Sequence, residues 1–428
     1  MRSPRTACFV AILGCGLVAT LAAPLAHAVD LSASGFGTLG YAVSDQPYHY
    51  QRFIDDHGSF KRDTVLGGQV DAKLSPEWSA TVQAKVAPSL NNDEDWSLTA
   101  SWAFVSWRPN NDWLLRLGKQ RVPMYLNSEN LDVGQTYDFA RLPFEMYGLA
   151  PTTDLTGLYV SRNWMLDIGE TSLDLFSGGA NLKSRAYLRD AGAVFLPVHT
   201  KETGAVLTLR RDTSTWRLSL HHTTTRLRNG DDFPSHYPYV EGGGVAYYRV
   251  SNNMPGLEPV GTTDYIVNDI ITLAGDIELA PNWRLVSELA RNIQMRTENG
   301  ANTAGGYVAV LHKVGDFTPY VSYARLRSMG VSVQVANALN AVQSPALNFF
   351  DPRLNASQRQ ASDAILVFDQ DTVALGTSYA LTSQSKLKAE WARTRIGNRS
   401  ATVDSPAGED VIRRQRINVL SLSYSFVF

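Results

Sequence analysis

The chain ends in the stretch Ile417–Phe428, INVLSLSYSFVF, in which apolar and small residues alternate without interruption. An extended strand points successive side chains to opposite faces, so one face here is apolar and the other is small and mostly polar. The apolar face consists of Leu420, Leu422, Tyr424, Phe426 and Phe428. An edge strand of a soluble sheet that ended on three exposed aromatic residues would be an aggregation hazard. The pattern therefore favours the closing strand of a transmembrane β-barrel.

The composition is that of a large ordered protein: 428 residues, of which 44% are hydrophobic, 10% aromatic and 19% charged. The formal net charge of −2 gives no global field that would attract nucleic acid, so we expect no nucleic-acid partner. The mean hydropathy of −0.17 would suit a soluble protein. It does not exclude a membrane barrel, because a barrel strand shows only half of its residues to lipid.

The first 28 residues are typical of a cleaved secretory signal peptide. They begin with Arg2 and Arg5, continue through an apolar run and end on Ala26-His27-Ala28, an A-x-A cleavage site. A helical anchor is the alternative, but the run is shorter than the ~20 residues that a span needs. The sequence therefore predicts one exported domain over residues 29–428.

Few residues suggest chemistry beyond binding. Cys8 and Cys15 both lie in the signal segment, so the mature chain has no disulfide or thiolate metal site. His221 and His222 are adjacent in an expected strand and would point to opposite faces, so they could not share a metal ion or a proton relay. We expect no cofactor, no metal site and no catalytic residues.

Alternating segments recur along the whole mature chain. In 66–74 the apolar phase alternates with Gln69, Asp71 and Lys73, and after a short turn 78–86 repeats the pattern. Counting these two and the closing strand gives about sixteen antiparallel strands in an all-β fold. The other segments lie near 31–41, 98–104, 113–117, 158–160, 173–175, 206–210, 216–220, 271–279, 283–285, 307–311, 320–324, 373–381 and 387–391.

The connections alternate between turns of a few residues and long loops, the longest near Arg226–Asn268 and Leu326–Gln370. Loops of this size argue against an ordinary globular domain. In an outer-membrane barrel the short turns face the periplasm and the long loops face outside. Four tryptophans each begin a strand after a short turn, which predicts an aromatic girdle at the periplasmic boundary of the lipid. They are Trp78, Trp113, Trp216 and Trp283.

A sheet can span lipid only if it closes on itself, because every backbone polar group must be hydrogen-bonded internally. The polar phase of each strand then points inward, and unpaired charges in a dry interior would cost several kcal/mol per ion. Sixteen strands enclose enough width for an aqueous channel. The sequence therefore predicts a water-filled lumen through which small hydrophilic solutes diffuse passively.

The segment Arg121–Leu155 follows the fifth expected strand. The run Gly118–Pro123, GKQRVP, overlaps its start, and Arg141–Tyr147, RLPFEMY, lies further on. With the loop position and the terminal Phe, these motifs resemble the general and ion-selective porins of Gram-negative outer membranes. The resemblance implies a homotrimer in outer-membrane lipid, a loop folded into the lumen, and recognition of Tyr424, Phe426 and Phe428 by the barrel-assembly machinery. The chain is also distantly similar to the phosphate-selective porins, but it lacks the lysine-rich cluster that is expected of them.

If this loop folds inward, its acidic residues could face basic wall residues and create a transverse field that sets ion preference. The acidic candidates are Glu129, Asp132, Asp138 and Glu145, and the basic ones are Arg116, Lys119, Arg121 and Arg141. The alternative is that these residues pair with one another and hold the loop against the wall.

Two other functions remain open at this stage. An outer-membrane enzyme predicts a smaller barrel of about ten to twelve strands with a catalytic cluster at one rim. A plugged barrel would bind a partner or a specific substrate through its long outer loops.

Overall fold

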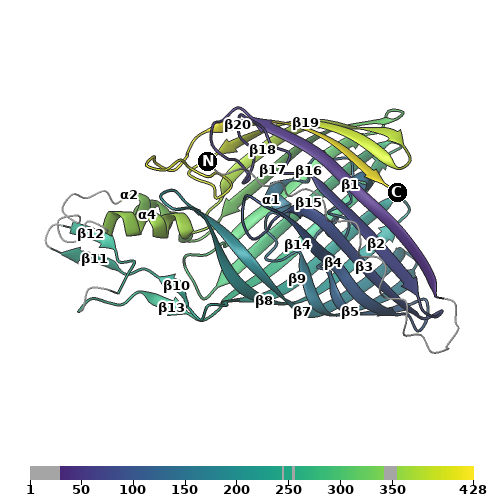
Figure 1. The fold of residues 1–428 in the computed structure, drawn as a ribbon, viewed down its shortest axis with the longest axis horizontal. Coiled ribbons are helices and arrows are strands. Elements are labelled where there is room, and N and C mark those ends of the chain that lie inside the picture. The colour runs from purple at the N-terminus through teal and green to yellow at the C-terminus, as the bar shows by residue number, and fades with distance from the viewer. Residues whose placement is uncertain (1–28, 243–244, 253–255, 342–353) are drawn as a thin grey trace, which may run out of the picture.

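The computed structural model describes residues 29–242, 245–252, 256–341 and 354–428, so the predicted signal peptide lies outside the described residues. Sixteen antiparallel strands form a closed barrel, in the order β1 to β9 followed by β14 to β20, and β20 pairs with β1 (Figure 1). The predicted fold class is thus confirmed.

The barrel strands are β1 (Asp30–Ser44), β2 (Val65–Lys73), β3 (Trp78–Pro88), β4 (Trp96–Trp107), β5 (Trp113–Arg121), β6 (Asp154–Leu166), β7 (Gly169–Leu188), β8 (Gly192–Arg211), β9 (Ser214–Leu227), β14 (Ile266–Ala280), β15 (Trp283–Met295), β16 (Thr303–His312), β17 (Phe317–Ser328), β18 (Asp369–Thr382), β19 (Ser385–Ile396) and β20 (Arg416–Val427). Shorter elements are the 3-10 helix η1 (Gly134–Thr136), the helices α1 (Phe144–Tyr147), α2 (Ser332–Ala341) and α4 (Leu354–Ala364), and the strands β10 (Phe233–His236), β11 (Tyr239–Gly242), β12 (Val245–Tyr248) and β13 (Gly261–Thr263).

The closing strand has the two faces that its sequence predicts. Leu420 and Leu422 are exposed on the outer face, whereas the alternating serines Ser421, Ser423 and Ser425 are buried on the inner face. The terminal aromatic rings lie against the glycine-rich first strand. A Cβ at Gly35 would come within 2.2 Å of the Phe428 ring, so a larger residue there would have to displace that ring from the seam of the barrel.

Strand β4 departs from the simple alternation of its sequence. The segment 98–104 predicts one continuous apolar face, but Ser101 is left without a partner on β3, because Gln83 pairs with Trp102 and Ala84 with Ala100. This β-bulge moves Trp102 to the inner face, and Trp107 to the outer face. The prediction of a single face was wrong because one extra residue reverses the phase.

The predicted girdle tryptophans all lie at the short-turn end of the barrel, on the outer face. Trp78 stacks on Trp107 with ring centroids 6.0 Å apart, and Trp283 stacks on His312 at 4.0 Å. Trp113 is exposed, whereas Trp216 is half-buried between its neighbouring strands. The bulge in β4 explains why Trp107 is absent from the predicted girdle.

The long-loop end carries a projecting extension (Figure 1). The connection 228–265 forms two small two-stranded sheets, β10 with β13 and β11 with β12, and the connection 329–368 contributes α2 and α4. An apolar cluster joins the two connections, with Tyr237 on one side and Val335, Leu339 and Ile365 on the other. None of the helices in the described part of the chain is long and apolar enough to cross a membrane.

Strands β7 and β8 are 20 residues each and continue well past the segments near 173–175 and 206–210 that the sequence identifies. Their upper halves contain polar residues on both faces, so the two-residue period that marks a lipid-facing strand is lost there. The hairpin that they form rises to the same end as the projecting extension.

Candidate channel constriction

The connection between β5 and β6, residues 122–153, crosses the interior of the barrel and contacts the walls on several sides. The carbonyl oxygen of Met124 accepts hydrogen bonds from Ser219 on β9 at 3.1 Å and from Thr272 on β14 at 3.2 Å. Farther along, the Phe139 carbonyl accepts a bond from Lys388 on β19 at 3.1 Å. We call residues 122–153 the interior loop.

Part of the interior is dry, which differs from the uniformly wet inner face that the sequence predicts. The interior loop places Met124, Phe139 and Met146 against apolar inner-face residues such as Tyr307 and Tyr320. The two tyrosine rings pack edge-on against Phe139 at 5.9 and 5.0 Å. Because the rings of these tyrosines pack against the loop and their hydroxyls donate to buried carboxylates, this sector of the wall binds the loop rather than water.

Asp132 connects the interior loop to β3 and β5. Lys85 contacts its two carboxylate oxygens at 2.7 and 2.8 Å, and Arg121, only 3% exposed, forms a second ion pair with it. Arg121 also lies 3.3 Å from Asp154. Burial by itself would raise the pKa of the Asp132 carboxyl, but the two cations outweigh it and hold that pKa below its ordinary value.

Asp138 connects the loop to the opposite wall. Its carboxylate accepts hydrogen bonds from Lys386 and Ser378, each at 2.9 Å, and lies 3.4 Å from Arg284. Burial again acts to raise the pKa of this carboxyl, and Lys386 with its neighbours lowers it below the ordinary value. Asp132 and Asp138 are thus both ionised loop groups with their charges met by the wall.

Arg141 and Glu145 are also bonded to residues outside the interior loop. Arg141 donates from Nε to Asp63 at 2.9 Å, in the connection between β1 and β2. Glu145, 2% exposed, accepts a hydrogen bond from Gln370 at 2.7 Å. Both residues fix the interior loop to other elements, but Glu145 meets only neutral donors, and of the candidate residues only Arg121 and Asp132 pair with each other.

Arg116 and Lys119 do not join the loop. Arg116 faces the interior but stacks over the rings of Phe104 and Tyr159, at 5.0 and 5.4 Å from their centroids. Lys119 pairs in register with Ala103 and Thr156, which are exposed on the outer face, so the structure places it outside the lumen. The strand alternation from Leu117, 67% exposed, gives the same result and corrects the expectation for Lys119.

Glu288 is the main anchor that sequence reasoning missed. It is fully buried on the inner face of β15 and accepts hydrogen bonds from the backbone N–H of Leu126 at 2.9 Å, Tyr147 at 2.6 Å and Tyr307 at 2.9 Å. The alternation of β15 could have identified it as an inward carboxylate. Nothing local to β15 indicates that a loop 140 positions away would supply its partners.

The larger cavities lie at the short-turn end. One of about 370 Å³ lies beneath the interior loop, and another of about 240 Å³ follows the inner faces of β2 to β5. Glu129, the one sequence-predicted acidic residue that is exposed, lines the first. Its other charged lining residues are Asp138, Arg210, Arg217, Asp276 and Arg284.

The long-loop end is crossed by ion pairs. Arg185 on β7 contacts Asp93 at 3.0 Å and Asp404 at 2.6 Å, and Arg52 also pairs with Asp93. These residues come from four connections or strand ends, and β7 lies nearly opposite the β19–β20 hairpin in the ring. We call Arg52, Asp93, Arg185 and Asp404 the mouth network.

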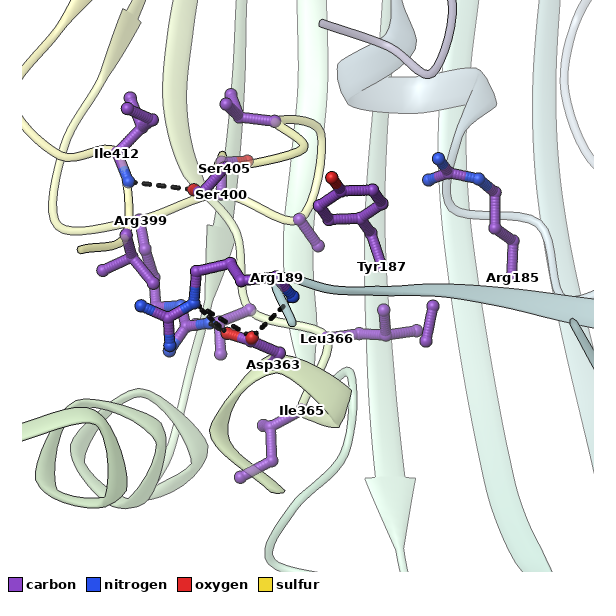
Figure 2. Close-up of a pocket in the computed structure, with 15 residues that line it drawn as sticks. Arg185, Tyr187, Arg189, Asp363, Ile365, Leu366, Arg399, Ser400, Ser405 and Ile412 are labelled. Carbon is purple, nitrogen blue, oxygen red and sulfur yellow. Dashed lines mark hydrogen bonds and ion pairs between the residues drawn. The ribbon is translucent and has the colours of Figure 1, made fainter. Parts of the chain in front are cut away.

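A second set of ion pairs lies beside it around a cavity of about 50 Å³ (Figure 2). Arg189 donates to Asp363 at 3.0 Å, and Arg399 lies 3.5 Å from the same carboxylate. Burial lowers the pKa of Arg399 to about 10, with Asp363 only partly offsetting that effect. Together the two sets connect β7 to the loops that follow β17 and β19.

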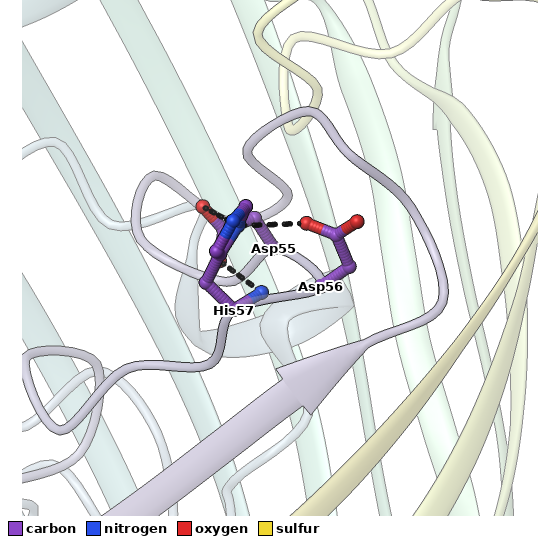
Figure 3. Close-up of side chains that lie close together, drawn as sticks. All are labelled: Asp55, Asp56 and His57. Atoms are coloured by element: carbon purple, nitrogen blue, oxygen red, sulfur yellow. Dashed lines mark hydrogen bonds and ion pairs between the residues drawn. The ribbon is translucent and has the colours of Figure 1, made fainter.

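Possible metal ligands come together once among the described residues, in the connection between β1 and β2. Asp55, Asp56 and His57 have ligand atoms within 4.8 Å of one another (Figure 3). His57 is 86% exposed at its side chain and already pairs with Asp56 at 2.9 Å. An exposed cluster whose members satisfy one another is an ordinary loop arrangement, and we assign it no metal.

The adjacent histidines point to opposite faces, as the sequence predicts. His221 is buried inside the barrel, 2.9 Å from Glu202, whereas His222 is exposed outside, 2.7 Å from Asp269. The two rings cannot act on one ligand.

No family model matches the chain, and no curated protein matches it. Several solved structures are similar to it in fold. The trimer form of OmpT, an outer membrane protein of Vibrio cholerae, aligns over 94% of this chain and 99% of its own with a TM-score of 0.52 and 10% identity. The outer membrane channel DcaP of Acinetobacter baumannii aligns over 93% of this chain and 97% of its own, with a TM-score of 0.52 and 11% identity. Salmonella typhi OmpF in complex with daunomycin aligns over 92% of this chain and 97% of its own, with a TM-score of 0.50 and 11% identity.

At such identities the likeness shows the fold alone. The fold is that of the sixteen-stranded outer-membrane barrels, a class that includes channel proteins, and the resemblance to outer-membrane porins is confirmed at this level.

Proposed function

We propose that this protein is a porin of the Gram-negative outer membrane, exported by a cleaved signal peptide and assembled as a homotrimer. Small hydrophilic solutes and ions would diffuse through its lumen past the interior loop. The observation that carries the proposal is the polar cavity of about 370 Å³ beneath that loop, inside a closed barrel. A barrel of this width can hold water along its length where side chains and loops leave room.

The cavity also indicates which residues would set ion preference. Asp132, Asp138 and Arg141 already have partners, so the exposed Glu129 and Arg210 are the charges left to act on a passing ion. Both line the cavity, and they carry opposite charges. We expect Glu129→Gln to shift the reversal potential under a KCl gradient toward anions and Arg210→Gln to shift it toward cations.

The test is planar-bilayer conductance of the purified barrel. Closures in three equal steps would support a trimeric channel, and the two substitutions should move the reversal potential in opposite directions. Equal shifts of one sign would contradict the assignment of Glu129 and Arg210. A membrane that stays silent with folded protein inserted would contradict the open channel.

The second candidate is a plugged barrel that binds a partner or a specific substrate through its outer loops. The mouth network favours it, because Arg185, Asp93 and Asp404 connect elements across the long-loop end. In that case native protein would be silent in the bilayer, and Arg185→Gln would produce conductance. If the native protein conducts as much as Arg185→Gln does, the plugged barrel is excluded.

A further inference from the structure

The cavity of about 240 Å³ along the inner faces of β2 to β5 differs in its lining from the cavity beneath the interior loop. No residue lines both cavities. The smaller one contains two aromatic rings from successive inner-face positions of β4, Trp102 and Phe104, whose centroids are 6.0 Å apart. We call this cavity the β4 pocket.

The bulge in β4 turns these two rings inward. Leu98 and Ala100 lie on the outer face, and without the extra residue at Ser101 the same two-residue period would place Trp102 and Phe104 among the lipid-facing side chains. Bulges often re-aim side chains next to functional sites. Here the bulge adds aromatic rings to a part of the inner wall whose neighbouring strands carry polar side chains.

One flank of the β4 pocket presents hydrogen-bond acceptors on β2. The two carboxylate oxygens of Asp71 each accept one hydrogen bond, from Gln69 at 2.7 Å and from Thr81 at 2.6 Å. Gln83 in turn donates to Gln69 at 2.9 Å. A carboxylate offers about four lone-pair sites. Asp71 is therefore held in place by its neighbours and can still accept hydrogen bonds from a ligand.

The other flank presents hydrogen-bond donors. Arg116 on β5 stacks over the ring of Phe104, 5.0 Å from its centroid. Among the described residues, no atom accepts a hydrogen bond from the buried Nε of Arg116 or from the buried indole Nε1 of Trp102. Buried tryptophan N–H groups usually have a partner. Two such donors in one cavity favour a ligand that carries hydrogen-bond acceptors.

The chemistry of the two flanks and the rings matches a cyclic sugar. The C–H face of a pyranose ring can pack on an indole ring, and sugar hydroxyls both donate and accept hydrogen bonds. An aromatic carboxylate would match the rings and the donors, but its charge would meet the like charge of Asp71. The volume of about 240 Å³ is below the ~300–1,000 Å³ of pockets for drug-sized ligands, which suits a single sugar ring.

We propose that the β4 pocket binds a neutral sugar in its pyranose form, with the ring stacked on Trp102. Its hydroxyls donate to Asp71 and accept from Nε1 of Trp102 and Nε of Arg116. The proposal rests on the water-filled lumen of the proposed function and names a class of solute for it. Binding itself does not require conduction.

The test measures sugar binding to the full mature barrel in detergent by equilibrium dialysis. The probes are radiolabelled glucose, which forms a pyranose ring, and mannitol, an open-chain polyol that has hydroxyls but no ring face. We expect glucose to bind more tightly than mannitol. Trp102→Ala removes the stacking face and should weaken glucose binding by about tenfold. The matched control is Trp96→Ala, which removes a tryptophan from the outer face of the same strand and should bind glucose as the native protein does.

Trp102→Phe tests the same site with a smaller change to the fold. It keeps an aromatic ring in the β4 pocket and removes the indole N–H. Glucose should bind this variant more weakly than the native protein and more tightly than Trp102→Ala, and the preference over mannitol should remain. Trp102→Phe also keeps the test decisive if Trp102→Ala does not fold.

Asp71→Asn distinguishes a sugar site from an anion site. Loss of the carboxylate acceptor should weaken glucose binding, whereas loss of its charge should tighten binding of benzoate, an aromatic carboxylate. The proposal is overturned if glucose does not bind, if mannitol binds as well as glucose, or if both Trp102 variants bind glucose as the native protein does. It is also overturned if benzoate binds the native protein more tightly than glucose, which would make the β4 pocket an anion site.

The bilayer experiment separates this proposal from the channel. A native protein that is silent in the bilayer but binds glucose through Trp102 would contradict the channel and leave the sugar site. A protein that conducts but does not bind glucose would contradict the sugar site alone.

Discussion

Two long connections of this barrel, residues 122–153 and 228–265, end up on opposite sides of its wall. The first lies inside, where Asp132 and Asp138 meet cations of the wall and Glu288 collects three donors. The second projects outward and builds its own small sheets, which pack on α2 and α4. Length and polarity do not separate the two. What separates them is whether the inner wall offers partners for the side chains of the loop.

The strongest test of this contrast is Asp132→Asn. It removes the partner of two cations, of which Arg121 is almost fully buried, and breaking a buried pair costs about 3 kcal/mol. We expect that loss in the free energy of unfolding of the refolded protein, with a change in single-channel conductance as the loop loosens. Glu129→Gln, on the same loop but exposed, is the control and should leave the unfolding midpoint unchanged. If both variants unfold alike, the ion pairs do not hold the loop.

A smaller effect is expected at the mouth. Asp93→Asn removes the acceptor shared by Arg52 and Arg185, but these groups are partly exposed, so the stability change should be about 1 kcal/mol. The functional effect should be larger, an increase in conductance of the native barrel. Asp95→Asn, in the same connection and outside the mouth network, should change neither quantity. If both variants increased the conductance, the effect would not be specific to the mouth network.

As the pH falls, the ion pairs of the mouth network should break before those that hold the interior loop. Burial raises the pKa of Asp404, with Arg185 offsetting only part of that effect, whereas the pKa of Asp132 is lowered. As the pH falls, Asp404 is protonated first and Arg185 loses that partner. Asp132 has a folded-state pKa below its unfolded value, so its contribution to stability is present at neutral pH and is lost only below the ordinary carboxyl range.

The measurement is conductance and unfolding of the same protein as a function of pH. We expect conductance to change at a higher pH than the one at which the unfolding midpoint falls. A single transition common to both would show that the mouth and the interior loop are one cooperative unit.

The smallest effect on the barrel is expected in the outer extension. Tyr237→Ala empties a buried position between the small outer sheets and α2, which should expose 228–265 to protease. The barrel itself should unfold within about 0.5 kcal/mol of the native protein, because no barrel strand loses a contact. Tyr239→Ala, 55% exposed in the same connection, should alter neither proteolysis nor unfolding. A barrel destabilised by Tyr237→Ala would show that the extension is part of the core.

The strands were predictable wherever one face meets lipid. The closing strand and the hairpin of β2 and β3 have a strict period of two, because outward positions must be apolar and inward positions need not be. Prediction failed in two places for identifiable reasons. The bulge at Ser101 shifts the phase without any marker in the sequence, and the upper halves of β7 and β8 lie where neither face must be apolar.

The candidate site was predictable in position and not in pairing. The resemblance to porins pointed to the connection after the fifth strand, to which Glu129, Asp132, Asp138, Arg141 and Glu145 all belong. Their partners come from the whole chain: Lys85 and Asp63 precede the loop, whereas Lys386 and Gln370 follow it by more than 200 positions. Lys119 was wrongly included, because the alternation from Leu115 and Leu117 already places it on the outer face.

The sequence by itself therefore determined the barrel, its approximate number of strands and most of its lipid-facing surface, because burial in lipid imposes a local two-residue rule on the strands. The tertiary structure decided which loop enters the lumen and which charges are neutralised there. Those outcomes depend on register and closure, which bring together residues that no local pattern connects.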